Sequence, residues 1–291
     1  MTRQLDLTTP GACKLLAEWI TADIDAWCIK TFDDGHRSHL GASLIGEECS
    51  RKLWYHFRWV KHELTSGRMY RLFNRGHLEE DRFISYLRGI GFEVWNVDPN
   101  TGQQSRIYAC KGHFGGSLDG INKPPSRYGV NEPLLCEFKT KATGSGFVKL
   151  KKDGIIATNQ QHYAQMCSYG KYFGIRFALY MCVNKNDDDL HIEVIPLNWA
   201  LASDYIKRAD YVINTPTAPE KIAVNPSFWK CKACDYAGIC WKDEAPEINC
   251  RSCKHASPVD NAEWRCALWN ANIPKNAIPV GCTSHSPITR A

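Results

Sequence analysis

One segment, from Gly115 to Lys141, constrains the fold of this chain more than any other. It contains Asp119 near its beginning and ends with the mainly apolar run Leu-Leu-Cys-Glu-Phe-Lys. A short apolar run bounded by turn-forming residues is typical of a buried strand, in which every second side chain points to the same face. We therefore predict that Glu137 and Lys139 stand side by side at the edge of a core.

The residues between Asp119 and this strand predict a turn, because the stretch 124–129 contains two prolines and a glycine. Such a turn brings Asp119 beside Glu137, so that two carboxylates and the ammonium group of Lys139 converge. Carboxylate and carbonyl oxygens bind Mg²⁺ or Mn²⁺, and an adjacent lysine orients or deprotonates an attacking water or neutralises charge on a phosphate. A surface hairpin with a salt bridge is the alternative, because this pattern alone is common.

Length and composition limit the class of protein. A chain of 291 residues with 44% hydrophobic residues buries a full core, and we expect one main domain with an appendage. The formal charge of +5 permits nucleic acid binding without requiring it. No apolar run is as long as a membrane span, and the N-terminus lacks the features of a signal peptide. We expect a cytoplasmic protein, in the host cytoplasm if the chain is phage-encoded.

The chain has 14 cysteines, and reduced cysteines that cluster in a cytoplasmic protein more often bind metals than form disulfides. Eight of them, Cys49 and the seven between Cys231 and Cys282, suffice for two four-ligand sites. The other six lie in apolar surroundings and are predicted to be small buried residues: Cys13, Cys28, Cys110, Cys136, Cys167 and Cys182.

The first cysteine group has the spacing Cys231-x2-Cys234-x5-Cys240, which leaves one ligand to come from a distant part of the chain. Cys49 lies among basic and aromatic residues and is the candidate. An iron–sulfur cluster binds four thiolates of this kind. It would close a very long loop and so stabilise the fold.

The second group has the spacing Cys250-x2-Cys253-x12-Cys266-x15-Cys282. This pattern predicts a Zn²⁺ site, in which His255 or His285 is a substitute fourth ligand. In a rival arrangement, Cys250 or Cys253 completes a zinc site with the first three cysteines, and Cys49 is free.

Hydrophobic periodicity predicts helices and strands in an order that indicates a mixed α/β layered domain. A helix that starts at the N-cap Ser43 carries interleaved basic and aromatic residues, including Arg51 and Arg58. These suit phosphates and stacked bases, or the arginines simply face water on a core helix. The predicted helices are 13–29, 43–59, 155–172 and 198 to about 214, and the segment 67–95 is predicted to be a helix that runs through a glycine-containing turn into a strand. The two later strands are 176–185 and 190–197.

In the helix predicted for 155–172, Gln161, Gln165 and Tyr169 are each four residues apart and share one face. Polar side chains in this register can hold a phosphate or a lysine. They are also found on ordinary exposed helix faces.

Taken together, these residues resemble the PD-(D/E)XK nuclease superfamily, and within it the RecB-like branch whose nuclease domain is closed by a [4Fe-4S] cluster. Related groups are recombination helicase-nucleases, CRISPR-adaptation nucleases and phage recombination exonucleases. The resemblance implies a restriction-endonuclease-like mixed α/β sheet flanked by helices over residues 41–242. An N-terminal helical segment, 1–40, precedes this core, and a Cys-rich zinc-binding tail, 243–291, follows it.

The family order is a cysteine, an acidic or histidine residue on the first helix, Asp, Glu-x-Lys, a Gln-x3-Tyr helix and three cysteines. The matching residues are Cys49, His77 or Glu80, Asp119, Glu137, Lys139, Gln165, Tyr169, Cys231, Cys234 and Cys240. Many members have histidine in the fourth position after the helix glycine, where this chain has Glu80. The ligand on this helix therefore stays open between Glu80, which we favour, Glu79 and His77.

The resemblance implies a DNA exonuclease that acts on DNA ends or single strands in recombination, replication or phage DNA processing. Glu80, Asp119, Glu137 and the Phe138 carbonyl are the implied ligands of one or two Mg²⁺ or Mn²⁺ ions. Lys139 is then the residue that positions the attacking water, and Gln165 and Tyr169 support it or the phosphate. The alternatives are a junction-resolvase-like endonuclease and a non-catalytic DNA-binding adaptor. A recombination or replication protein is an expected partner.

Overall fold

The computed structural model describes residues 5–62 and 64–288, and the chain forms two compact units. The smaller unit comprises 1–35 and 63–78, and the larger comprises 36–62 and 79–291. The smaller unit contains helix α1 (Ala12–Phe32), which confirms the predicted N-terminal helix, and the first part of α3 (Gly67–Gly89). Arg71 pairs with Asp25 between these two helices.

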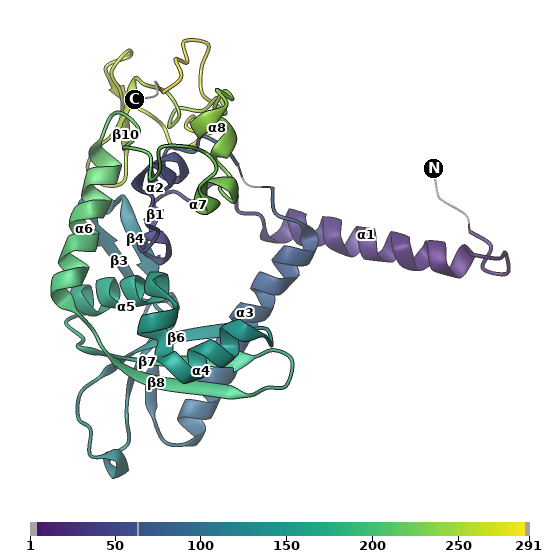
Figure 1. Cartoon of the computed structure of the whole chain (residues 1–291), viewed down its shortest axis with the longest axis vertical. Coiled ribbons are helices and arrows are strands. Elements are labelled where there is room, and N and C mark those ends of the chain that lie inside the picture. The colour runs from purple at the N-terminus through teal and green to yellow at the C-terminus, as the bar shows by residue number, and fades with distance from the viewer. Residues whose placement is uncertain (1–4, 63, 289–291) are drawn as a thin grey trace. The chain divides into compact units, whose positions relative to one another are not determined.

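The main sheet lies in the larger unit and has five strands in the order β2-β5-β6-β7-β8. Strands β6, β7 and β8 are labelled in Figure 1. Strands β6 and β7 are parallel, and all other neighbours are antiparallel. The sheet is therefore mixed, as predicted. Its strands are β2 (Glu93–Trp95), β5 (Gly120–Lys123), β6 (Leu134–Lys141), β7 (Phe177–Asn184) and β8 (Leu190–Pro196).

Alternation along β6 divides its side chains between two apolar layers. Cys136 and Phe138 pack with Phe83 and Leu87, which lie in the last part of α3. Leu135 points to the opposite layer, where α5 (Gln160–Phe173) packs on β6 and β7. Helix α4 (Ser145–Thr158) packs against β8, and α6 (Trp199–Asn214) packs against α5 (Figure 1). The predicted α/β class, a mixed sheet flanked by helices, is confirmed.

A smaller sheet has the order β1-β4-β3 and leads the chain into the main sheet. It is built from β1 (Leu40–Gly41), β3 (Arg106–Ala109) and β4 (Phe114–Ser117). Short 3-10 turns cover Ala42–Leu44, Cys110–Gly112 and Ser126–Tyr128. Only Leu118 and Asp119 separate β4 from β5, so Asp119 lies where the chain passes from one sheet to the next.

The helix predicted to start at Ser43 begins later, as α2 (Ser50–Phe57). Its N-cap is Cys49, whose Sγ accepts a hydrogen bond of 3.4 Å from the Lys52 backbone N–H. Gly46 packs against the backbone of Gln161, where a larger residue would clash. Tertiary packing therefore determines the conformation of residues 43–49, and they do not form an α-helix. The serine at 43 is in a 3-10 turn.

Neither prediction for the arginines of this region is correct. Arg51 and Arg58 are both 3% exposed, so they neither face water nor reach a nucleic acid. Arg51 Nε instead donates to the Pro219 carbonyl at 2.5 Å. The helix is buried on nearly all sides, because later parts of the chain cover its polar face.

The helix predicted for 155–172 is two helices. Asn159 separates α4 from α5, and its side chain accepts a hydrogen bond of 3.1 Å from the His162 backbone N–H. The N-cap preference of asparagine therefore decides where α5 begins.

The C-terminal residues add two short helices, α7 (Trp229–Lys232) and α8 (Ala237–Trp241), and a small antiparallel sheet. That sheet has the order β11-β10-β9, with β9 (Ala256–Pro258), β10 (Trp264–Cys266) and β11 (Ala271–Asn272). Among the described residues, no helix is long and apolar enough to cross a membrane. The domain boundaries at 41 and 243 stay predictions.

Four of the six cysteines predicted to be buried are buried: Cys28, Cys136, Cys167 and Cys182. Cys13 is exposed in the first turn of α1, and Cys110 is half-buried. The prediction is therefore wrong for Cys13 and only partly right for Cys110, because an apolar sequence neighbourhood does not ensure burial at the end of an element.

Candidate active site and cysteine clusters

Asp119 and β6 meet as the turn in the sequence predicts. Strand β5 pairs antiparallel with β6, with Gly120 opposite Cys136. The Phe138 backbone N–H donates a hydrogen bond of 2.7 Å to Asp119 Oδ2. The carboxylate of Asp119 is thus held against the middle of the Glu-x-Lys segment.

Glu137 and Lys139 form an ion pair on the face of β6 that points toward α5. Lys139 Nζ also donates to the Phe138 carbonyl at 3.1 Å. Glu137 is 1% exposed and, apart from the ion pair, neither of its carboxylate oxygens accepts a hydrogen bond from the described residues. A buried carboxylate with open lone pairs, beside a second carboxylate, is a donor set that suits a hard divalent cation.

The charges of this site act strongly on one another. Burial raises the pKa of Glu137 to about 7, the Lys139 ammonium opposes this shift, and the charge of Asp119 adds to it. Burial lowers the pKa of Lys139, but the carboxylates of Glu137 and Asp119 outweigh burial and raise it overall. One more positive charge would stabilise the ionised form of both acids.

Two glutamates of α3 differ in their surroundings. Glu79 pairs with Arg82 at 3.3 Å, and Arg82 also pairs with Asp188 at 2.9 Å. Glu80 accepts a hydrogen bond of 3.4 Å from Gln104, and its charge raises the pKa of Glu137. These contacts favour Glu80 over Glu79 as the third acidic ligand.

His77 is exposed and belongs to the smaller unit. It stays a candidate from the sequence alone.

Gln165 and Tyr169 are buried on α5, and their side chains form a hydrogen bond. Burial and the charges of Glu137 and Asp119 raise the pKa of the Tyr169 hydroxyl. Gly116 packs directly on this hydroxyl, where any side chain would clash, a contact that the sequence did not predict. Gln161, one turn earlier, instead donates to the Ser43 carbonyl at 2.8 Å.

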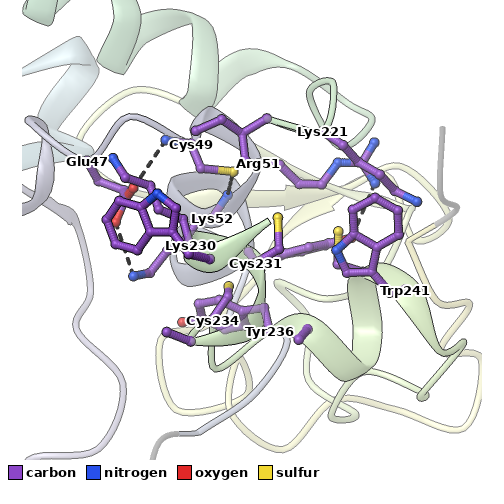
Figure 2. Close-up of a pocket in the computed structure, with 16 residues that line it drawn as sticks. Glu47, Cys49, Arg51, Lys52, Lys221, Lys230, Cys231, Cys234, Tyr236 and Trp241 are labelled. Atoms are coloured by element: carbon purple, nitrogen blue, oxygen red, sulfur yellow. Dashed lines mark hydrogen bonds and ion pairs between the residues drawn. The ribbon is translucent and has the colours of Figure 1, made fainter. Parts of the chain in front are cut away.

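The first cysteine group surrounds one cavity of about 250 Å³ (Figure 2). Cys49 comes from the N-cap of α2, Cys231 from α7, and Cys234 and Cys240 from the following turn and α8. Burial raises the pKa of Cys234 and of Cys240, and the neighbouring charge of Cys49 adds to both shifts. Four basic side chains also line this cavity: Arg51, Lys52, Lys221 and Lys230.

The second cysteine group lines a separate cavity of about 260 Å³, together with His285. Burial raises the pKa of Cys250, and the charges of Cys282, Cys253 and Cys266 each add to the shift. Because Cys250 and Cys253 line this cavity and not the first, the structure does not favour the rival arrangement.

Across residues 5–62 and 64–288, no group of three or more Cys, His, Asp or Glu side chains is already arranged to hold a metal ion. Metal binding at the carboxylates and at each cysteine group is therefore a proposal that rests on the donor sets.

A cleft of about 770 Å³ that the sequence reading missed lies beside β4. Gly115 and Gly116 line it, so it adjoins the segment that leads to Asp119. Its other lining residues include basic and aromatic side chains: His39, Arg106, Tyr108, Lys111 and Lys275. The basic and aromatic residues near 106–111 are the signal that would have indicated it.

No family model matches the sequence, and no curated protein matches it. Among solved structures, the fold is similar to the alkaline exonuclease LHK-Exo from Laribacter hongkongensis, at 16% identity over 67% of this chain and 90% of that chain, with a TM-score of 0.41. LHK-Exo in complex with dAMP gives 16% identity over 60% and 86%, with a TM-score of 0.42. The structure of SSO0001 gives 14% identity over 79% and 98%, with a TM-score of 0.42. Likenesses of this size leave function to be argued from the residues of the site.

Proposed function

We propose that this protein is a metal-dependent deoxyribonuclease of the PD-(D/E)XK type, an exonuclease that hydrolyses phosphodiester bonds at DNA ends or in single strands. The observation that carries the proposal is the convergence of Asp119, Glu137 and Lys139 on β6. Glu137 is buried there, and apart from its ion pair with Lys139 its carboxylate oxygens accept no hydrogen bond from the described residues. A purely structural salt bridge would leave no reason to bury an acid next to a second acid.

The carboxylates of Asp119, Glu137 and Glu80 and the Phe138 carbonyl would hold Mg²⁺ or Mn²⁺. When bound, the metal polarises the phosphoryl group and lowers the pKa of a bound water. Lys139 would orient the attacking water or neutralise charge on the phosphate. Tyr169 and its partner Gln165 hold the α5 side of the site in place.

The cleft beside Gly115 and Gly116 is suited to a DNA strand. Arg106, Lys111 and Lys275 offer positive charge to the phosphates, and Tyr108, which is 62% exposed, offers a surface for base stacking. Lys111 is also paired with Asp260 at 3.5 Å, so part of this charge is balanced in the free protein.

A digestion assay with end-labelled linear and closed circular DNA, with and without Mg²⁺, tests the proposal. We expect Mg²⁺-dependent loss of the linear substrate and no loss in Asp119→Asn, which keeps the shape of the side chain. Rapid cutting of circular duplex would instead indicate an endonuclease. A folded protein that cuts no substrate would indicate a DNA-binding adaptor.

We also propose a [4Fe-4S] cluster at Cys49, Cys231, Cys234 and Cys240. Such a cluster with four thiolates is anionic, and the lysines and arginine around this cavity would balance its charge. The visible spectrum and the iron content of anaerobically purified protein test this. A colourless protein with about two zinc ions per chain would contradict it.

For the second group, we propose Zn²⁺ bound by Cys250, Cys253, Cys266 and Cys282. The four thiols line one cavity, and the Cys-x2-Cys spacing is typical of zinc knuckles. Elemental analysis of the purified protein gives the zinc content directly.

A further inference from the structure

Two arginine side chains are buried where the C-terminal tail, which the structure describes over residues 243–288, packs on the rest of the larger unit. Arg58, at the end of α2, is 3% exposed, and Arg251, between Cys250 and Cys253, is 1% exposed. A guanidinium group in such a place destabilises the fold unless an opposite charge compensates it.

The hydrogen bonds of these arginines go to backbone carbonyls. Arg58 donates to the carbonyls of Ala256 at 3.0 Å and Cys253 at 2.9 Å. Arg251 donates to the Ser38 carbonyl at 3.0 Å. In the part of the chain that the structure describes, Nε of both arginines and Nη2 of Arg251 find no hydrogen-bond partner.

Aromatic rings fix the position of Arg251 without neutralising its charge. Its guanidinium lies over the rings of Phe57, Trp59 and Trp264, at 4.4, 4.3 and 4.6 Å from their centroids. Arg58 also lies over the Trp264 ring, 5.1 Å from its centroid. Two like charges therefore share one aromatic core.

No carboxylate of residues 5–62 or 64–288 compensates either charge. Both arginines instead adjoin the second cysteine group: Arg58 Nη2 donates to the Cys253 carbonyl at 2.9 Å, and Arg251 lies in the chain between Cys250 and Cys253. The compensating charge is thus to be found in the second cysteine group.

We propose that Arg58 and Arg251 balance the charge of the zinc centre at Cys250, Cys253, Cys266 and Cys282, so that zinc binding and docking of the tail depend on each other. This inference rests on the zinc site proposed above. Four thiolates and one Zn²⁺ carry a net charge of −2, which equals in size the charge of the two arginines.

The structure connects the cysteine pair to the core through short contacts. Arg251 lies within the Cys250-x2-Cys253 turn. A movement of these two cysteines would therefore also move the Arg251 side chain within the aromatic core. Asn249 donates to the Trp59 carbonyl at 2.8 Å and accepts from the Ser252 N–H at 2.9 Å. Without the metal centre, no carboxylate of residues 5–62 or 64–288 forms an ion pair with the two arginines inside the docked tail.

Transfer of Zn²⁺ from the full-length protein to a chromophoric chelator tests this coupling. Arg58→Met and Arg251→Met remove the charge and keep an apolar side chain of similar length. We expect each to release zinc at least about tenfold more readily than the unaltered protein, as loss of an outer-shell partner usually does. Arg58→Lys keeps the charge and should retain most of the affinity.

Arg265→Met is the matched control, because Arg265 is an exposed arginine of the same tail. If both buried-arginine variants release zinc like this control, the inference is wrong, although the zinc site itself stands. If the unaltered protein contains no zinc at this site, the zinc proposal is the part that fails.

Limited proteolysis and tryptophan fluorescence provide a second readout that does not require the variants to fold. Removal of zinc by chelator from the unaltered protein should expose the tail to protease and change the total tryptophan emission, to which the buried Trp264 contributes. A tail that stays equally protected after complete zinc removal would overturn the inference.

Discussion

At the scale of single residues, burial decides what Glu137 can do. An acid with 1% exposure is normally neutral or fully paired, yet here it has a lysine on one side and Asp119 on the other. The Asp119 side chain has little freedom, because the Phe138 backbone N–H donates a hydrogen bond to its carboxylate. The main chain therefore holds the carboxylate of Asp119 against the middle of β6, beside Glu137.

Replacement of Lys139 by methionine should abolish catalysis and leave the fold intact. The substitution keeps most of the apolar stem and removes the ammonium group that faces Glu137. We expect DNA cleavage under Mg²⁺ to fall by at least about a hundredfold, measured as initial rate on end-labelled linear DNA.

Lys149→Met is the control, because Lys149 is exposed on α4. Circular dichroism should match for both variants and the unaltered protein. A Lys139→Met protein with more than about a third of the normal rate would remove this lysine from the proposed chemistry.

Sequence reasoning succeeded for Glu137 and Lys139 because strand alternation is a local rule. It failed for Arg51 and Arg58, since their environment is made by residues far along the chain, such as Pro219 and Ala256. A basic residue near aromatics looks the same in sequence whether it faces DNA or lies in a core.

At the scale of elements, helix α5 supports one side of the candidate site. It begins at Asn159, whose side chain caps the helix, and it brings Tyr169 against Gly116. The sequence reading placed this helix but began it five residues too early, because the side-chain periodicity continues through Asn159 from α4. Capping, not periodicity, sets the boundary.

Substitution of Asn159 by alanine should destabilise the protein by about 1 kcal/mol, the usual contribution of an N-cap. Chemical denaturation with fluorescence detection measures this change, and Asn159→Asp should restore most of it because aspartate also caps helices. Equal stability of the alanine variant and the unaltered protein would show that tertiary contacts alone fix the start of α5.

Helix α2 carries a histidine that makes the fold sensitive to acid. Burial lowers the pKa of His56 from 6.5 to about 4, and nearby positive charges, first that of Arg37, add to the shift. The folded state thus favours the neutral ring. The resulting stability is fully present above pH 6.5 and is lost as the pH falls from 6.5 toward 4.

We expect the free energy of unfolding to fall over this interval by up to roughly 3 kcal/mol from His56. His56→Gln should flatten that part of the profile, measured by denaturant titrations at a series of pH values. The same substitution at His62, outside α2, serves as the control. An unchanged slope in His56→Gln would mean that other groups cause the acid sensitivity.

At the scale of the whole molecule, the larger unit is closed by contacts between residues close to its beginning and the C-terminal region. Cys49 lines the same cavity as Cys231, Cys234 and Cys240. Arg58 donates a hydrogen bond to the backbone carbonyl of Cys253 in the tail. The sequence predicted the two cysteine groups, because the spacing of the eight cysteines outside apolar elements separates them into two sets of four. It did not reveal that buried arginines lie beside the second group, since Arg58 and Arg251 are buried by residues far away in the sequence.

Loss of Cys49 should therefore damage folding before it affects chemistry. The metal centre proposed for the first cysteine group would connect Cys49 with Cys231 and close a loop of roughly 180 residues, which would restrict the unfolded chain. We expect Cys49→Ser to lose the visible absorption of the cluster and to lower the melting temperature by about 10 °C or more. Cys13→Ser, at an exposed cysteine outside both groups, should change neither. A Cys49→Ser protein that keeps its melting temperature but loses only nuclease activity would place this cysteine in the chemistry instead of the fold.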